Sequence, residues 1–412
     1  MALELDKIFK SFDKNGIFKD KAMLQINYQP DEIPHRDEQI KQIASILAPV
    51  LRGEKSSNLF LYGKTGTGKT LSIQYVKDEL LKRAAKNTDF KLRIEYLNCK
   101  LRKVSDTEYR ILAELIKKLG GEVPDTGLPT ESVYNRFIKM IDSDKQLIVI
   151  VLDEIDQAVK KISSDFLYNL TRLNSELSKT QICLVGISNN LTFLDELDPR
   201  VRSSLSEEEV IFPPYNALQL QDILKKRADN AFRENTLEDG VIAKCAAFAA
   251  REHGDARRAL DLLRVAGELA ERDNSERILL KYIDEANNKI EKDKVLDIIA
   301  SEPKQFQYVL HSIIYLSEQR NRNSSKKGGS SEPIFTGDVY NYYKDFIRNK
   351  SEVLTQRRVS DIVQEFDMLG IINVRVISKG RGGRMREIKL AIPNDVVEKA
   401  KNIIKDSIQF LY

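Results

Sequence analysis

The stretch Gly63-Lys64-Thr65-Gly66-Thr67-Gly68-Lys69-Thr70 has the complete G-x-x-x-x-G-K-T spacing of a phosphate-binding loop. Its glycines permit a tight turn whose N–H groups face inward toward phosphate oxygens. The lysine of such a loop reaches the β- and γ-phosphates, and the last threonine can bind Mg²⁺. We predict nucleotide contacts from the loop and the next residue: Gly63, Lys64, Thr65, Gly66, Thr67, Gly68, Lys69, Thr70 and Leu71.

Both flanks of the loop support this interpretation. Residues 58–62 form a short, mostly apolar run that is typical of a buried strand. After the loop, apolar residues recur at helical spacing from Ile73 to Ala84, so a helix N-terminus faces the phosphates. A glycine-rich turn that arose by chance would lack this strand–loop–helix context.

A second motif ends an aliphatic run at residues 147–152. Such a run is typical of a parallel strand buried on both faces, and ligands bind at the carboxyl ends of these strands. Asp153 and Glu154 follow directly. We expect Asp153 to hold Mg²⁺ together with Thr70, and Glu154 to act as general base on the attacking water. Alone, the pair could be a solvated acidic turn, but the preceding phosphate loop favours a catalytic role.

Three more polar groups are expected near the γ-phosphate. Asn189 follows the candidate strand 181–186 at the same sheet edge. Arg257 begins a helix that could fold over the nucleotide and report the γ-phosphate. Arg200 could reach the ATP of a neighbouring subunit, and Arg202 is an equally good candidate.

The chain divides into three predicted domains. Strand and helix patterns alternate up to Pro213-Pro214, which predicts an α/β fold with a parallel sheet covered on both faces. Helical patterns follow, and a third part begins near Val295. We expect residues 1–25 to be an irregular arm and the polar run 321–331 to be a flexible loop. The predicted domains are 1–213 (α/β base with the arm and a helical insertion), 214–294 (α-helical lid) and 295–412.

The last domain reads as a winged helix. Residues 355–369 predict a helix with Thr355 as N-cap and Gly370 as its stop. Two alternating runs then predict a β-hairpin with a basic, glycine-rich tip, suited to close approach to a nucleic-acid groove. Residues 295–412 hold 19 Lys and Arg against 14 Asp and Glu, which also favours an anionic partner. The candidate DNA-binding residues are Arg357, Arg358, Lys379, Arg381, Arg384 and Arg386.

The composition excludes several other classes of protein. Among 412 residues, 42% are hydrophobic and 31% charged, as in soluble globular proteins. No run approaches the ~18 apolar residues of a membrane span, and the N-terminus does not read as a signal peptide. The three cysteines are far apart and share no ligand spacing with the histidines, which indicates buried thiols in a reducing compartment and argues against zinc.

Together these motifs resemble the AAA+ ATPases, in which Asn189 would be sensor 1 and Arg257 sensor 2. Within the AAA+ ATPases, the sequence most resembles the archaeal origin-recognition initiators of Orc/Cdc type. This resemblance is carried by Tyr28–Arg36, by Gly186–Asn189, by Leu197–Val201 and by an insertion with a helix near residues 109–119.

This resemblance implies an AAA+ base, a helical lid and a C-terminal winged-helix domain. It implies ATP or ADP with Mg²⁺, slow hydrolysis used as a switch, and double-stranded origin DNA as partner. Other initiator subunits and the replicative helicase are further implied partners, in the cytoplasm at the nucleoid and with no membrane. Additional nucleotide contacts are expected from His35, Arg36 and Tyr215, and weaker DNA contacts from Lys100, Arg102 and Lys103.

Two other functions fit parts of the pattern. A clamp-loader-like remodelling ATPase would share the nucleotide motifs, but the basic wing argues against it. A transcription regulator with a purely structural nucleotide site would share the winged helix, but the intact Lys69 and Glu154 argue against that.

Overall fold

The computed structural model describes residues 16–86, 90–100, 107–124, 127–327, 333–348, 351–378 and 384–409. The chain forms two compact units, Met1–Ala286 and Asn287–Tyr412. The three-domain division predicted above, with boundaries after residues 213 and 294, stays a prediction. No helix among the described residues is long and apolar enough to cross a membrane.

The first unit contains a five-stranded parallel sheet in the order β2-β3-β4-β1-β5. Strand β3 is buried along its whole length, as its aliphatic sequence predicts. Every predicted strand is present. The bounds are β1 (Asn58–Gly63), β2 (Lys91–Asn98), β3 (Gln146–Asp153), β4 (Thr180–Ser188) and β5 (Glu207–Phe212).

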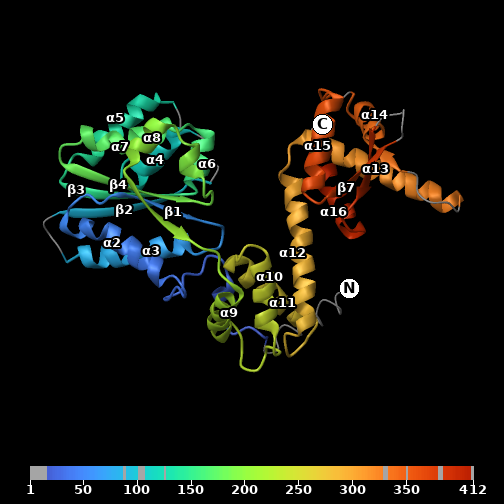
Figure 1. Ribbon diagram of the computed structural model, residues 1–412, viewed down its shortest axis with the longest axis horizontal. Coiled ribbons are helices and arrows are strands. Elements are labelled where there is room, and N and C mark those ends of the chain that lie inside the picture. Colours follow the sequence, from blue (N-terminus) through green and yellow to red (C-terminus); the bar gives the residue numbers. More distant parts are fainter. Residues whose placement is uncertain are drawn as a thin grey trace. The chain divides into compact units, whose positions relative to one another are not determined.

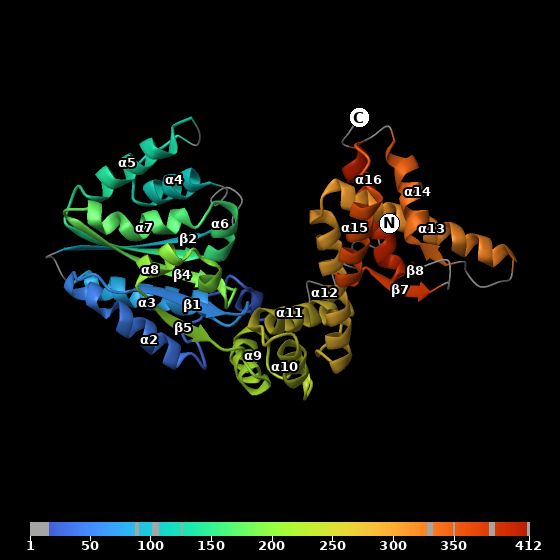
Figure 2. The same ribbon diagram turned by 45° about the horizontal axis from the view of Figure 1, so that its top comes forward.

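Helices cover both faces of this sheet, and Figures 1 and 2 show the two layers. On one face α2 (Asp37–Leu47) and α3 (Lys69–Ala84) pack on alternate strand residues such as Leu61 and Val149. The other face buries the remaining alternate residues, including Phe60 and Ile150. It is covered by α4 (Glu108–Lys118), α5 (Thr130–Ile141), α6 (Ile155–Lys161), α7 (Asp165–Glu176) and α8 (Pro199–Leu205).

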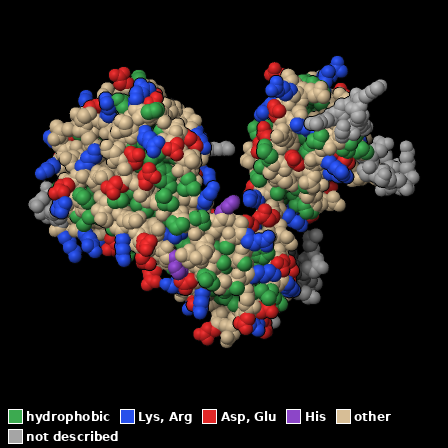
Figure 3. Space-filling view, viewed as in Figure 1, with side chains coloured by type: hydrophobic (Ala, Val, Ile, Leu, Met, Phe, Trp, Pro, Cys, Tyr) green, Lys and Arg blue, Asp and Glu red, His purple; other side chains and the backbone are tan. Residues whose placement is uncertain are grey.

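A helical lid follows β5 within the same unit. It consists of α9 (Ala217–Ala231), α10 (Val241–Arg251), α11 (Ala256–Arg272) and the start of α12 (Leu280–Ser301). The described part of the N-terminal arm is anchored on the lid, because Phe18 stacks on Phe232 with ring centroids 4.9 Å apart. It includes the short helix η1 (Lys21–Leu24). On the face in Figure 3, acidic and basic side chains are interspersed over this unit.

The second unit is a winged helix. A three-stranded antiparallel sheet, β6-β8-β7, packs with helices around one apolar core. The predicted helix and hairpin are confirmed: Thr355 Oγ1 caps α15, and Gly370 follows it at φ 70°. The bounds are α13 (Lys304–Lys327), β6 (Ile334–Phe335), α14 (Thr336–Ile347), α15 (Gln356–Met368), β7 (Ile372–Ser378), β8 (Arg384–Leu390) and α16 (Asn394–Gln409).

The prediction of a flexible loop from residue 321 is wrong for its first part. Helix α13 continues through Lys327. A helix that is already nucleated gains a backbone hydrogen bond with each added residue, and no Gly or Pro interrupts this chain before Gly328. Residues 328–331 of that prediction lie outside the described part of the chain.

Candidate active site and nucleic-acid interface

The phosphate loop joins β1 to α3 and touches the lid. Gly66 and Gly68 have φ values of 71° and 91°, which favour glycine strongly. At Gly66 space is also limiting, because a Cβ atom there would lie 1.7 Å from Asp255 Oδ1. Ala256 N donates to the Gly66 carbonyl at 3.3 Å. The start of α11 therefore rests directly on the loop.

Lys69 connects this loop to β4. Its side chain is almost fully buried, and Nζ donates to Gly63 O at 2.7 Å, Lys64 O at 2.9 Å and Asn189 Oδ1 at 2.9 Å. An ammonium group has three donors, so all three are used. Burial lowers the pKa of Lys69 to about 8, against the attraction of Asp153. The structure thus brings Lys69 and Asn189 together, as the predicted shared site requires.

The carboxylate of Asp153, the last residue of β3, accepts hydrogen bonds from several groups. Its Oδ2 accepts from Thr70 Oγ1 at 2.8 Å and from the Tyr96 hydroxyl at 2.6 Å. Its Oδ1 accepts from Glu154 N at 2.9 Å, and Glu154 adopts a left-handed φ of 55°. Tyr96 was missed from the sequence, because a tyrosine in a strand carries no signal that it faces a carboxylate across the sheet edge.

Thr70 and Asp153 fit a Mg²⁺ ion. Oxygen ligands lie about 2.1 Å from Mg²⁺ in octahedral geometry, so neighbouring ligand oxygens are about 3 Å apart. The two side-chain oxygens here are 2.8 Å apart. Within the described ranges no group of three or more His, Cys, Asp or Glu could hold a metal. A Mg²⁺ ion with few protein ligands is typical of sites where phosphates and waters complete the shell.

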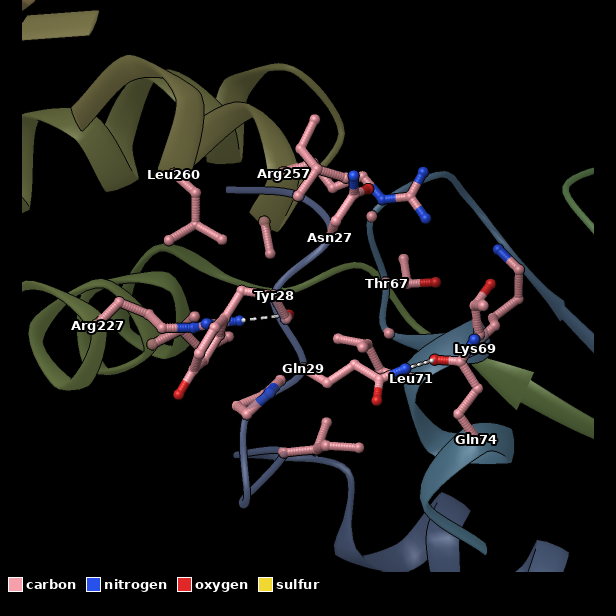
Figure 4. Close-up of a pocket in the computed structure, with 18 of the residues that line it drawn as sticks. Asn27, Tyr28, Gln29, Thr67, Lys69, Leu71, Gln74, Arg227, Arg257 and Leu260 are labelled. Carbon is pink, nitrogen blue, oxygen red and sulfur yellow. Dashed lines mark hydrogen bonds between the residues drawn. The ribbon is translucent and has the colours of Figure 1, made fainter. Parts of the chain in front are cut away.

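A cavity of about 830 Å³ lies beside the loop, large enough for a nucleotide. Figure 4 shows its three sources: Tyr28 and Gln29 from the N-terminal segment, the phosphate loop, and Leu260 with other side chains of the lid. Its polar end includes Asp153, Glu154 and Asn189. The apolar lining, suited to a purine ring, comes from Ile26, Tyr28, Ile33, Pro34, Leu71, Ile223 and Leu260.

The N-terminal segment that lines the cavity with Tyr28 and Gln29 is held in place from two sides. Gln29 Nε2 donates to Gln74 Oε1 at 2.8 Å. From the lid, Arg227 lies over the Tyr28 ring at 4.4 Å and donates to Met23 O at 3.0 Å. Arg257 was predicted from the lid, but Ile223, Arg227 and Leu260 were not, because the apolar and basic residues of an amphipathic helix do not reveal which of them face a cavity.

Arg257 projects from the N-terminus of α11 and lines the cavity, as Figure 4 shows. Asp255 caps this helix and accepts from the Arg257 backbone N–H at 2.8 Å. The Arg257 side chain is exposed, and its charge helps to lower the pKa of Lys69. The positive charges of Arg257 and Lys69 therefore both face the same cavity.

His35 and Arg36 do not line the cavity. His35 Nε2 lies 3.0 Å from Asp222 Oδ2. Arg36 is buried behind the loop, where it donates to the Thr67 carbonyl at 2.8 Å and lies 3.8 Å from the centre of the Tyr215 ring. Only Tyr215 of these three residues lines the cavity.

Arg200 and Arg202, the two candidates for contact with the ATP of a neighbouring subunit, lie on α8 and outside the cavity lining. Arg200 is 81% exposed and forms a bidentate pair with Asp198, with both N–O distances at 3.1 Å. Arg202 is 50% exposed and contacts Asp195 at 2.8 Å. Both are surface groups, and their contacts do not distinguish between them as candidates.

Lys100 lies nearer to the nucleotide site than expected for a DNA contact. Its Nζ is 3.7 Å from Glu154 Oε2, although the lysine is 73% exposed. Arg102 and Lys103 lie outside the described residues.

The winged helix exposes Arg357 and Arg358 at the start of α15. Arg358 also contacts Glu365, with an N–O distance of 3.6 Å. Arg386 of β8 donates to Ser360 Oγ at 3.1 Å, which ties the wing to this helix. Lys379, Arg381 and the side chain of Arg384 lie outside the described part of the structure.

A five-stranded parallel sheet with this phosphate loop, the paired acids, a helical lid and a winged helix defines an AAA+ ATPase. Family models agree: an AAA ATPase domain matches residues 32–185, a Cdc6 AAA+ ATPase-type lid domain 221–288 and a CDC6 C-terminal winged helix domain 297–400.

Comparison with similar proteins identifies the family within the AAA+ ATPases. The chain is 49% identical to an ORC1-type DNA replication protein of Thermococcus onnurineus, over 97% of this chain and 94% of that one. It is 48% identical to ORC1-type DNA replication protein 1 of Methanosarcina mazei, over 98% and 94%. The solved structure of the Aeropyrum pernix ORC1 protein in complex with DNA matches with a TM-score of 0.81 and 42% identity, over 96% and 99% of the two chains. The chain therefore belongs to the ORC1/Cdc6 family of DNA replication proteins.

Proposed function

We propose that this protein is an ATP-dependent replication initiator that binds double-stranded origin DNA. The main support for this proposal is structural: nearly the whole chain matches an ORC1 protein that was solved in complex with DNA. Here the ATP site and the winged helix are parts of one chain. That combination suits a protein whose DNA binding responds to its nucleotide.

The site residues divide the chemistry of hydrolysis among them. Thr70 and Asp153 hold Mg²⁺, which neutralises phosphate charge when bound. Lys69 turns its ammonium group from loop carbonyls to the phosphates, and Asn189 is then free to bind the γ-phosphate or the attacking water. Glu154 takes the proton from that water. Arg257 reads the γ-phosphate from the lid, and Arg200 or Arg202 reaches the ATP of a neighbouring initiator subunit.

Slow hydrolysis suits such a switch, because a long-lived ATP state gives time for assembly on DNA. In this proposal the ATP state recruits the replicative helicase, and the protein works at the nucleoid in the cytoplasm. The DNA interface consists of α15 and the basic wing, supported by the segment around Lys100, Arg102 and Lys103. Arg386 holds the wing against α15 and adds its charge to this interface.

Binding to labelled duplexes tests the proposal. A duplex from a replication start should bind more tightly than a scrambled duplex of equal length, and ATP and ADP should give different affinities. ATP turnover should stay slow when duplex is added. Fast, duplex-stimulated turnover without sequence preference would instead support a remodelling ATPase, and equal DNA binding with either nucleotide would support a transcription regulator.

A further inference from the structure

Arg36 occupies an unusual place for a cation beside a nucleotide site. It is 2% exposed, at the start of α2, and it is not among the residues that line the cavity. Its guanidinium group donates to three carbonyls: Nε to Thr67 O at 2.8 Å, Nη1 to His35 O at 3.0 Å and Nη2 to Pro213 O at 2.6 Å. Burial of a charge without such partners would be strongly unfavourable, so the three contacts hold the group in one place.

Two aromatic rings fix the plane of the same group. The guanidinium carbon lies 3.8 Å from the centre of the Tyr215 ring and 5.7 Å from that of Phe212. The planar fork and the cation–π contacts suit arginine and no other cation, because a lysine ammonium is compact and cannot reach carbonyls in several directions.

The contact with Thr67 acts on the peptide that enters Gly68. In a trans peptide the C=O of one residue and the N–H of the next point in opposite directions. Because Arg36 holds the Thr67 carbonyl, the Gly68 N–H is directed away from Arg36, and Gly68 lines the cavity. Inward N–H groups of this kind form the anion-binding concavity of a phosphate loop.

The contact with Pro213 extends this link to the lid. Pro213 follows β5, and the chain continues through Tyr215 into α9. Tyr215 also closes on the loop, because a Cβ atom at Gly68 would lie 2.9 Å from its hydroxyl oxygen. One buried guanidinium thus joins the phosphate loop, the start of α2 and the connection to the lid.

We propose that Arg36 is a positioning residue for phosphate binding: it holds the loop peptide between Thr67 and Gly68 in its anion-binding orientation without touching the nucleotide. The inference rests on the proposed nucleotide site and goes beyond it by assigning Arg36 to the loop backbone. A residue with this role governs affinity for the phosphate chain that ATP and ADP share. It leaves affinity for adenosine and the ratio of ATP to ADP affinity unchanged.

Calorimetry on the full chain with adenosine, ADP and ATP tests this. In Arg36→Lys the affinities for ADP and ATP should fall together, by roughly tenfold or more, because hydrogen bonds from a charged group are lost. Adenosine affinity should stay at the wild-type value. Arg36→Gln, which is neutral and keeps a planar donor, should show the same pattern and serves if the lysine variant does not fold.

Arg227 provides a control, because it is partly buried, also donates to backbone carbonyls and also stacks on a tyrosine, but it lines the cavity beside Tyr28. Arg227→Lys should weaken adenosine, ADP and ATP alike. An equal loss of adenosine binding in the Arg36 variants, unchanged ADP binding, or a loss for ATP much larger than for ADP would each overturn the proposal. Absence of ATP and ADP binding in the wild-type chain would instead refute the proposed function.

Discussion

Asn189 Oδ1 accepts a hydrogen bond of 2.9 Å from Lys69 Nζ, which joins the end of β4 to the phosphate loop 120 residues earlier in the chain. The same ammonium group is bound to two loop carbonyls. A phosphate that draws Lys69 away must therefore release Asn189 as well. The lysine that we propose to bind the nucleotide and the amide that we propose to sense it are therefore coupled through this hydrogen bond.

Nucleotide affinity should depend on pH through Lys69. Its pKa in the free protein is lowered to about 8, mainly by burial, and bound phosphates would raise it. Well below pH 8 the lysine is charged with or without nucleotide, so affinity should be constant there. Above pH 8 binding must take up a proton, so affinity should fall by up to about tenfold per pH unit.

Calorimetry between pH 6.5 and 9.5 in buffers of different ionisation enthalpy checks this by counting protons. Lys69→Arg, whose side chain keeps its charge over this range, is the control and should show no proton uptake. Proton uptake of the same size in that variant would assign the effect to another group.

Glu154→Gln should keep ATP binding and lower turnover by roughly 10²- to 10⁴-fold, because the amide cannot accept a proton from water. Lys69→Ala should weaken binding itself. Single-turnover hydrolysis together with a binding titration separates the two effects. Hydrolysis by Glu154→Gln at the wild-type rate would show that another group is the base.

Arg257→Ala should reduce the preference between ATP and ADP, because the side chain lines the cavity from the lid and in our proposal reads the γ-phosphate. Arg251→Ala, an exposed lid arginine outside the cavity lining, should bind both nucleotides as the wild type does. Competitive calorimetry measures both ratios. An equal loss of ATP and ADP affinity in Arg257→Ala would indicate a packing role.

Replacing Arg381 and Arg384 by alanine should weaken binding to origin duplex. If they contact phosphates, the slope of log K against log salt should become shallower by about 0.9 per lost contact. If they read base edges, each loss should cost about 1–3 kcal/mol on the specific site and less on other DNA. Titrations at several salt concentrations distinguish the two cases.

Lys399→Ala, an exposed lysine on α16, is the control for a general loss of charge. A fragment of residues 295–412 should keep weaker duplex binding. Unchanged affinity and slope in the double variant would remove the wing from the interface.

Much of the fold could be predicted because its signals are local. The phosphate loop, the buried strand before Asp153 and the alternation of the wing each occupy a short stretch with a distinct period. Contacts between segments that lie far apart in the sequence could not be predicted from such local patterns. Arg36 was predicted to contact nucleotide, but its partners Thr67 and Pro213 come from two other parts of the chain. The carboxylate contact of Tyr96 depends on the register between β2 and β3.

Footprinting of the full chain on genomic DNA with ATP decides whether this protein marks replication origins. We expect a small number of protected sites beside replication starts, with protection that changes when ADP replaces ATP and disappears in the Arg381 and Arg384 double variant. Protection scattered without relation to replication starts, or identical with ATP and ADP, would contradict an ATP-dependent initiator.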